Sequence, residues 1–126
     1  MTGSPLFSLE KTDGFERSFR KLAKSKAYGN SFSDKISDIL KNLLDEVSPR
    51  DSRDEPLPGG ASIPDGWTLH KLEIRMGKGA SGQVRLIYLV NESDSIVRPL
   101  WLYSHEQFSK RPPDRELKNA IKNAIE

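Results

Sequence analysis

The stretch KLEIRMGKGASGQVRLIY, residues 71–88, decides the fold that the sequence predicts. It joins two strand-like segments. In residues 67–76, apolar and charged side chains alternate, as in a strand with one buried face. Residues 83–90 (QVRLIYLV) are apolar on both faces, which is typical of a central strand covered by helices on one side and partly covered on the other. The glycine-rich residues 77–82 between them predict a hairpin connection.

Two amphipathic helices are predicted between the N-terminus and this hairpin. Asp13 can cap the first helix, and Ser31 or Ser33 can cap the second. The apolar side chains of the first helix are Phe15, Phe19, Leu22 and Ala23. Those of the second are Phe32, Ile36, Ile39, Leu40, Leu43, Leu44 and Val47. Consecutive amphipathic helices form a helical hairpin, whose apolar faces must pack on the strands that the rest of the chain supplies.

The remaining segments complete the topology. They are a short edge strand at 6–11, a surface loop rich in proline and glycine at 49–66, a turn at 91–95, a strand at 96–103 and a C-terminal helix at 113–126. Pro99 marks either the start of the last strand or a bulge in it, and the final helix is expected to dock loosely. The sequence therefore predicts one α+β domain, residues 1–126, in the order β-α-α-β-β-β-α. Its N-terminal helical hairpin packs on a small, mainly antiparallel four-stranded sheet.

The composition excludes several classes of protein. None of the 126 residues is cysteine, which rules out disulfides, cysteine-ligated zinc and a thiol nucleophile. The two histidines, His70 and His105, are too few for a metal cage, so we expect no metal and no other cofactor. No signal peptide is evident, and no apolar run approaches the roughly 20 residues that span a bilayer. A cytoplasmic protein without a membrane partner is expected, and its net charge of +2 does not by itself indicate nucleic acid.

Residues 77–82 (GKGASG) spell G-x-G-x-x-G, the pattern of nucleotide-binding glycine loops. The context argues against this interpretation. A dinucleotide fingerprint opens a helix, whereas a strand is predicted here, and a kinase needs V-A-I-K, H-R-D and D-F-G elements that the chain lacks. A Walker A loop needs Lys followed by Ser or Thr at the positions of Gln83 and Val84. A structural hairpin connection is therefore the better interpretation.

The G-K-G-x-S-G-x-x-R-x-I-Y pattern of residues 77–88 resembles the signature of the RelE/HigB toxins in the RelE/ParE superfamily. The order of helical hairpin, loop, strands and closing helix is similar to that family across most of the chain. The resemblance implies a RelE/ParE-like fold and the toxin of a type II toxin–antitoxin system, silenced by a cognate antitoxin. It also implies a metal-independent endonuclease that cuts messenger RNA on the ribosome, by attack of the 2′-hydroxyl on the adjacent phosphate.

The resemblance further implies which side chains act. Arg85 matches the central-strand arginine and is the leading candidate for binding the phosphate, because a guanidinium contacts phosphate oxygens bidentately; the alternative is a structural ion pair. Glu73 is a candidate base or a salt-bridge partner of Arg75, and His105 is a candidate for proton transfer. The candidate catalytic residues are Arg85, His105, Lys71 and Glu73. The candidate RNA-binding residues are Arg75, Lys78, Lys110, Arg111 and Phe108.

Departures from the family leave other functions open. Members that cleave RNA often carry a C-terminal tyrosine, and no tyrosine follows Tyr103 in this chain. Phe108 could supply stacking but no acid–base chemistry. The alternatives are a ParE-like inhibitor that binds DNA gyrase and is not an enzyme, and a catalytically weak binding member of the same fold.

The nuclease interpretation requires a particular arrangement of three side chains. Arg85, Lys71 and His105 must lie on the same side of the sheet, so that their side chains can surround one phosphate. Three large aromatic residues, Tyr88, Trp67 and Trp101, are assigned to the core or to sheet faces and not to base binding, because aliphatic residues alternate with them.

Overall fold

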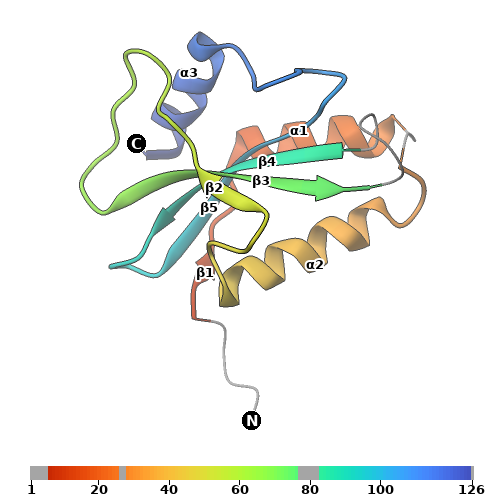
Figure 1. Cartoon of the computed structure of the whole chain (residues 1–126), viewed down its shortest axis with the longest axis horizontal. Coiled ribbons are helices and arrows are strands. Elements are labelled where there is room, and N and C mark those ends of the chain that lie inside the picture. Colours follow the sequence, from red (N-terminus) through yellow and green to blue (C-terminus); the bar gives the residue numbers. More distant parts are fainter. Residues whose placement is uncertain (1–5, 26–27, 77–82, 126) are drawn as a thin grey trace.

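The structure is a computed structural model that describes residues 6–25, 28–76 and 83–125 (Figure 1). In these ranges the chain forms, in order, β1 (Ser8–Leu9), α1 (Asp13–Lys24), α2 (Phe32–Asp45), β2 (Ser52–Asp54), β3 (Trp67–Arg75), β4 (Gln83–Asn91), β5 (Ile96–Ser104) and α3 (Asp114–Ile125). The predicted α+β class is confirmed. The predicted order of elements lacks one strand, β2, which lies between the helical hairpin and β3 in the sequence.

The strands form one mixed sheet in the order β1-β5-β4-β3-β2. β1 runs parallel to β5, and all other neighbouring strands are antiparallel. The predicted hairpin is the pair β3–β4, which extends from Trp67 opposite Asn91 to Arg75 opposite Gln83. Its predicted connection, residues 77–82, lies outside the described residues. This pair forms the centre of the sheet, with β5 and β2 on either side of it.

Helices cover both faces of the sheet, which explains why β4 is apolar on both faces. α1 and α2 both contribute side chains to the core on one face. The core on that face includes Phe15, Leu22, Ile36, Leu40 and Leu43 from the helices and Leu72, Ile74, Val84 and Leu86 from the strands. α3 covers the other face, with a core that includes Leu69, Ile87, Leu89, Leu100, Leu117 and Ile121. Side chains that alternate along β4 therefore enter two separate cores.

Pro99 lies at a bulge, one of the two predicted alternatives. Ile87 pairs with Trp101 while Tyr88 pairs with Pro99, so Leu100 is an additional residue in β5. Proline has no amide hydrogen to donate to a neighbouring strand, and an irregular point in the pairing is where it is tolerated.

The additional strand β2 lies in the segment that was predicted to be a loop, and this part of the prediction is wrong. Ser52, Arg53 and Asp54 pair with Leu72, Lys71 and His70 of β3. Three polar residues near prolines carry no strand periodicity, so the sequence does not reveal them. Their strand conformation depends on the edge of β3, whose backbone groups need partners.

The predicted cap of α1 is also wrong by one residue. The N-cap is Thr12, whose Oγ1 accepts a hydrogen bond of 3.1 Å from the amide of Phe15. The same hydroxyl donates to the carbonyl of Pro99 at 2.8 Å, which fixes the start of α1 to the sheet. Asp13 instead occupies the first turn, where a negative charge is favourable. At α2 the cap position is Ser31, although its side chain makes no capping hydrogen bond.

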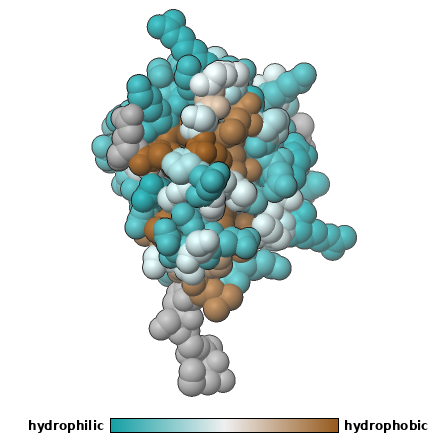
Figure 2. All heavy atoms as spheres, turned by 90° about the vertical axis from the view of Figure 1, so that its left-hand side faces the viewer, coloured by the Kyte–Doolittle hydropathy of each residue, from teal (hydrophilic) through white to brown (hydrophobic). Residues whose placement is uncertain are grey.

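The C-terminal helix docks more firmly than expected. Leu117 and Ile121 are 0% and 1% exposed, because the second apolar face of β4 receives them. The loop before β3 packs beside α3, and Ala61 and Ile63 contact the same core. Figure 2 shows the side of the molecule that carries this loop and α3, where apolar side chains gather among polar ones.

Truncating the buried stripe of α3 is expected to destabilise the whole fold. Leu117→Ala should lower the free energy of unfolding by about 2–5 kcal/mol, the cost of a cavity in a packed core. Chemical denaturation measures this change. The exposed Arg115→Ala on the same helix is the control and should stay within about 0.5 kcal/mol of the wild type. A loosely docked helix would give the two variants equal stability.

His70 lies on the face of the sheet that α1 and α2 cover. Its ring stacks on Tyr88 with 5.3 Å between ring centroids, and its Nε2 lies 2.7 Å from Thr68 Oγ1. Burial lowers the pKa of His70 below 6.5, and the nearby carboxylates of Asp54 and Glu92 only partly oppose this shift. The unfolded chain therefore binds a proton at a higher pH than the folded one does.

The stability of the protein is expected to depend on pH through His70. Its lowered pKa contributes stability that is present above pH 6.5 and is lost as the pH falls through the folded pKa. Replacing it by His70→Phe, which keeps a ring on Tyr88, removes this dependence. Denaturation curves at pH values between about 7.5 and 5.5 should show wild-type stability falling relative to the variant as the pH decreases. A constant difference between the two proteins across this range would contradict the assignment.

Candidate functional site

The face of the sheet that α3 covers also carries the charged residues of the central hairpin. Because Leu72 and Ile74 point into the core under the helical hairpin, Lys71, Glu73 and Arg75 point to the opposite face. The register of the strands places Glu73 directly opposite Arg85. The alternation predicted from the sequence thus brings these charges together at the end of the face that α3 leaves open.

Arg85 is held by three groups at once. Its Nη1 donates to the carbonyl oxygen of Ser109 at 3.0 Å and lies 3.2 Å from His105 Nδ1. Its Nε is 3.7 Å from Glu73 Oε1, and within the described residues this buried nitrogen has no hydrogen-bond partner. With its side chain only 11% exposed, the guanidinium is both fixed and incompletely satisfied.

The contact between Arg85 and His105 determines which hydrogen-bonding role Nδ1 of the histidine can take. A guanidinium can only donate hydrogen bonds, so Nδ1 of His105 must be the acceptor. The bond therefore forms only with neutral His105 whose proton is on Nε2. A positively charged His105 has to give up this bond before it can donate a proton from Nδ1.

A buried glutamate joins the other cations of the site. Glu55 follows β2, and its amide donates to the carbonyl of Leu69 at 2.9 Å. Its side chain is 6% exposed, with one oxygen 3.5 Å from Lys71 Nζ and the other 3.0 Å from Arg111 Nη1. Arg111 also donates to the carbonyl of Pro56 at 2.6 Å and to Asp114 at 3.1 Å. The carboxylate holds two cations in place although it is almost fully removed from water.

These residues surround one hollow of about 500 Å³, which we call the basic hollow. It is lined by Arg53, Glu55, Pro56, Lys71, Arg85, Ser109, Lys110 and Arg111. The lining thus contains five basic side chains and one acidic one. Such a concave cluster of cations attracts an anion, and guanidinium groups match the oxygens of a phosphate.

Tyr103 lies behind the part of the basic hollow that Lys110 lines. It is fully buried, and its hydroxyl donates to the carbonyl of Lys110 at 2.7 Å. Burial raises the pKa of this hydroxyl well above its usual value of 10, while the neighbouring Arg85 opposes the shift. Tyr103 therefore remains a neutral donor at physiological pH and fixes the backbone that carries Lys110.

The structure brings most of the candidate residues together. Arg85, Lys71, Lys110 and Arg111 line the basic hollow, and His105 contacts Arg85. The geometric requirement is met, because Arg85, Lys71 and His105 share one side of the sheet. The roles of these residues in chemistry remain predictions.

Other candidates lie apart from the basic hollow. Glu73 does not line the hollow itself, and its ion pair is with Arg85 and not with Arg75, its other predicted partner. Arg75 is exposed at the end of β3 and does not line the hollow. Phe108 packs against the rings of Trp101 and Tyr103. Lys78 lies outside the described residues.

Three residues of the site were not identified from the sequence. Arg53 and Glu55 belong to the segment predicted as a loop, and the sequence marks Tyr103 only as the last tyrosine of the chain. No local pattern marks Glu55, because its partners Lys71 and Arg111 are distant in sequence and the pairing of β2 brings them close.

The fold is that of the RelE toxins, an α+β fold in which a helical hairpin covers one face of the sheet. The protein is similar to one chain in the crystal structure of the archaeal RelE–RelB complex from Pyrococcus horikoshii OT3, with 18% identity, a TM-score of 0.53 and coverage of 79% of this chain and 94% of that one. It is also similar to a double arginine-to-alanine mutant of the E. coli toxin RelE in the free state, with 16% identity, a TM-score of 0.57 and coverage of 98% and 100%. No protein-family model and no curated protein matches the chain. At these identities the likeness shows the fold.

Two further observations concern the described residues alone. Within 6–25, 28–76 and 83–125 there is no group of three or more His, Cys, Asp or Glu side chains that could hold a metal ion. In the same ranges, no helix has the length and apolar content that crossing a membrane requires.

Removing the charge of Glu55 is expected to destabilise the site and the protein. Glu55→Gln leaves the buried ammonium of Lys71 without its carboxylate partner and weakens the hold on Arg111, which should cost about 1–3 kcal/mol of unfolding free energy. Denaturant titration measures this loss. Glu106→Gln, at an exposed position beyond β5, makes the same charge change and should have little effect. Equal stability of the two variants would show that the buried carboxylate does not hold the site together.

Proposed function

We propose that this protein is the toxin of a toxin–antitoxin pair and that it cleaves messenger RNA without a metal ion. In this reaction the 2′-oxygen of a ribose attacks the adjacent phosphorus, the bond to the 5′-oxygen of the next nucleotide breaks, and a 2′,3′-cyclic phosphate forms. The catalyst must accept the proton of the 2′-hydroxyl, stabilise the charge on the phosphorane and supply a proton to the leaving oxygen.

The observation that carries this proposal is the fixed, nearly buried guanidinium of Arg85 in the basic hollow. Its hydrogen bond to the carbonyl of Ser109 and its ion pair with Glu73 hold it before substrate arrives, so little reorganisation is needed. Lys71 lines the same hollow and adds a second positive charge. Both charges are partly shielded from water. In such surroundings they stabilise a developing anion better than exposed charges do.

The proton transfers are assigned to Glu73 and His105. Glu73 is 41% exposed and keeps carboxylate oxygens accessible to a substrate hydroxyl, which suits a base. Neutral His105 uses Nδ1 for Arg85, so it cannot act as a base there while the bond lasts. We assign it the role of acid, taken up when a phosphate displaces Arg85 from the imidazole and His105 gains a proton.

The partners of the proposed toxin follow from the same fold. One of the similar structures is a complex of RelE with RelB, which supports a protein antitoxin as the partner of this chain. We propose messenger RNA on the ribosome as the substrate and the cytoplasm as the location. A protein that keeps such a site active in a cell needs an inhibitor bound to it, and the antitoxin would supply this.

The central test is a cell-free translation extract with a defined message. Wild-type protein should stop translation and leave messages cut within the coding region, mapped by primer extension. Arg85→Ala should slow cleavage by about 100-fold or more, the usual cost of losing one donor to a developing oxyanion. Arg85→Lys keeps the charge and loses the paired donors, so we expect intermediate activity.

Controls separate loss of function from loss of fold. Arg115→Ala removes an exposed cation of α3 and should cleave as the wild type does. Thermal melting followed by circular dichroism checks that the Arg85 variants are folded. Full activity of folded Arg85→Ala would exclude this residue from the mechanism. Intact messages together with inhibition of DNA supercoiling by the wild type would instead support a gyrase inhibitor.

A further inference from the structure

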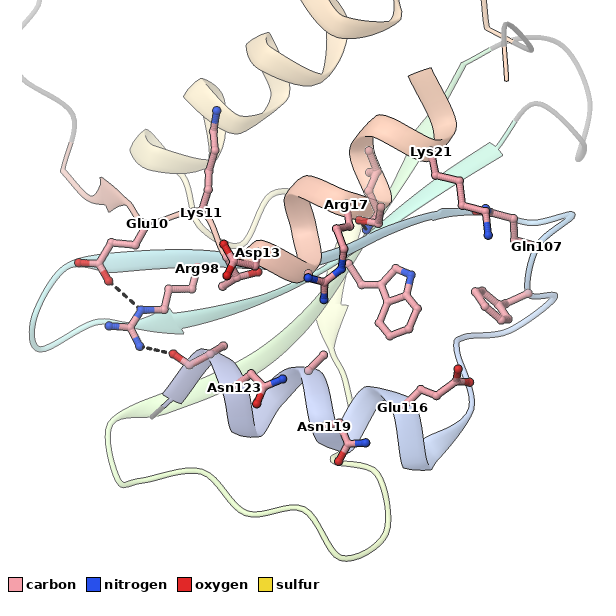
Figure 3. A pocket seen from close by; sticks show the side chains of 18 residues that line it. Glu10, Lys11, Asp13, Arg17, Lys21, Arg98, Gln107, Glu116, Asn119 and Asn123 are labelled. Atoms are coloured by element: carbon pink, nitrogen blue, oxygen red, sulfur yellow. Dashed lines mark hydrogen bonds and ion pairs between the residues drawn. The ribbon is translucent and has the colours of Figure 1, made fainter. Parts of the chain in front are cut away.

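A second hollow, larger than the basic hollow, lies between α1, β5 and α3 (Figure 3). Its volume is about 750 Å³, and we call it the α1–α3 groove. The two hollows share a wall. Gln107 and Phe108 line the groove, while the next residues along the chain, Ser109, Lys110 and Arg111, line the basic hollow.

Two aromatic rings line the groove. Trp101 and Phe108 are both partly exposed and meet edge to face, with 6.0 Å between their centroids and 87° between their planes. Phe108 also contacts Tyr103, whose hydroxyl holds the carbonyl of Lys110 in the basic hollow. Partly exposed aromatic rings are the surfaces on which unpaired bases stack. Trp101 was predicted to be a core or sheet-face residue, and the structure gives it an open side.

Two cations of α1 form one wall of the groove. Figure 3 shows Arg17 and Lys21 directed into it from the same side of α1. They are four residues apart in the sequence, which places their Cβ atoms about 5–6 Å apart on one helix face. Both are exposed, and among the described residues neither has an ion-pair or hydrogen-bond partner. Unpaired cations on a concave surface are available to an anionic ligand.

The remaining lining is mostly polar. Glu10, the acid nearest to Arg98, is bound to that arginine at 2.7 Å and is not available to Arg17 or Lys21. Asn119 and Asn123 line the α3 side of the groove and carry both donors and acceptors, as the edge of a base does (Figure 3). Asp13 and Glu116, at the first turns of α1 and α3, also line it. Among the described residues neither acid forms an ion pair with Arg17 or Lys21, and the groove lining holds four basic and three acidic side chains in all.

We propose that the α1–α3 groove binds single-stranded RNA beside the cleavage site. A base stacks on the rings of Trp101 and Phe108, and the flanking phosphates lie on Arg17 and Lys21. This inference rests on the proposed function, since the strand reaches the groove by passing over the shared wall from the basic hollow. A peptide ligand would not need this combination of stacking surface, amide groups and unpaired cations, whereas a nucleotide uses all three.

The test uses an RNA that cannot be cleaved, a 2′-O-methyl oligonucleotide of about ten nucleotides, which is within the size range of single-strand sites. Its binding to the full chain is followed by fluorescence anisotropy at several salt concentrations. The double variant Arg17→Ala/Lys21→Ala should bind it about five- to thirtyfold more weakly, as expected for two exposed charge contacts. The slope of log affinity against log salt should fall by about 1.4, or about 0.7 for each lost phosphate contact.

One control is a protein variant with the same change in charge, and another is a shorter RNA. Lys35→Ala/Lys41→Ala removes two exposed cations from α2 and should leave the affinity and its salt slope nearly unchanged. A 2′-O-methyl dinucleotide carries a single phosphate, so Arg17→Ala/Lys21→Ala should weaken its binding less than the binding of the longer RNA. In a Trp67→Phe protein, where Trp101 is the remaining tryptophan, the longer RNA should quench fluorescence because a base stacks on the indole.

Several results would reject RNA binding in the groove. Equal affinity and equal salt slope for the two double variants would overturn it, and so would binding of the oligonucleotide without quenching of Trp101. If Arg17→Ala/Lys21→Ala weakens only the binding of the antitoxin, the groove is a protein-docking surface and the inference is wrong. Failure of the wild type to cut messages, with the groove contacts intact, would instead reject the proposed nuclease and leave a single-strand RNA site.

Discussion

The antiparallel pairing of β3 with β4 is the constraint on which the rest of the molecule depends. Side chains alternate across a strand, so a single register sends Leu72, Ile74 and Leu86 to one face and Lys71 and its charged neighbours to the other. A shift of one residue would exchange the two sets and bury the charges under the helical hairpin. The core that α1 and α2 provide therefore also determines on which side the basic hollow lies.

The buried charged groups of the basic hollow are held by hydrogen bonds and ion pairs, and burying them costs stability. Burying a charged group is unfavourable unless hydrogen bonds or ion pairs compensate it. Glu55 compensates Lys71 and Arg111, while Glu73 and Ser109 restrain Arg85. The arrangement holds the cations close together before any ligand arrives, which suits a site for a multiply charged anion better than it suits a structural core.

The segment after β5 connects the two hollows physically. Tyr103 anchors it from below through Lys110, and Phe108 packs on Tyr103 from the side of the groove. A displacement of this segment would change both hollows together, because the same few residues form the wall between them. Folding stability and ligand binding are thus coupled in this part of the protein, where α3 begins directly after the shared wall.

The sequence by itself determined the class of the fold, the three helices and the β3–β4–β5 order, because hydrophobic periodicity is a local property of each segment. It also determined that Lys71, Glu73 and Arg75 share a face of one strand, since alternation along a strand needs no knowledge of distant residues. That Arg85 of the next strand lies on the same side was decided by the pairing of β3 with β4. Only the tertiary structure decided that Ser52–Asp54 forms a strand and that Glu55 binds Lys71 and Arg111. It also decided that the stripe of α3 is fully buried. These features depend on partners far away in the chain, and no local pattern encodes such contacts.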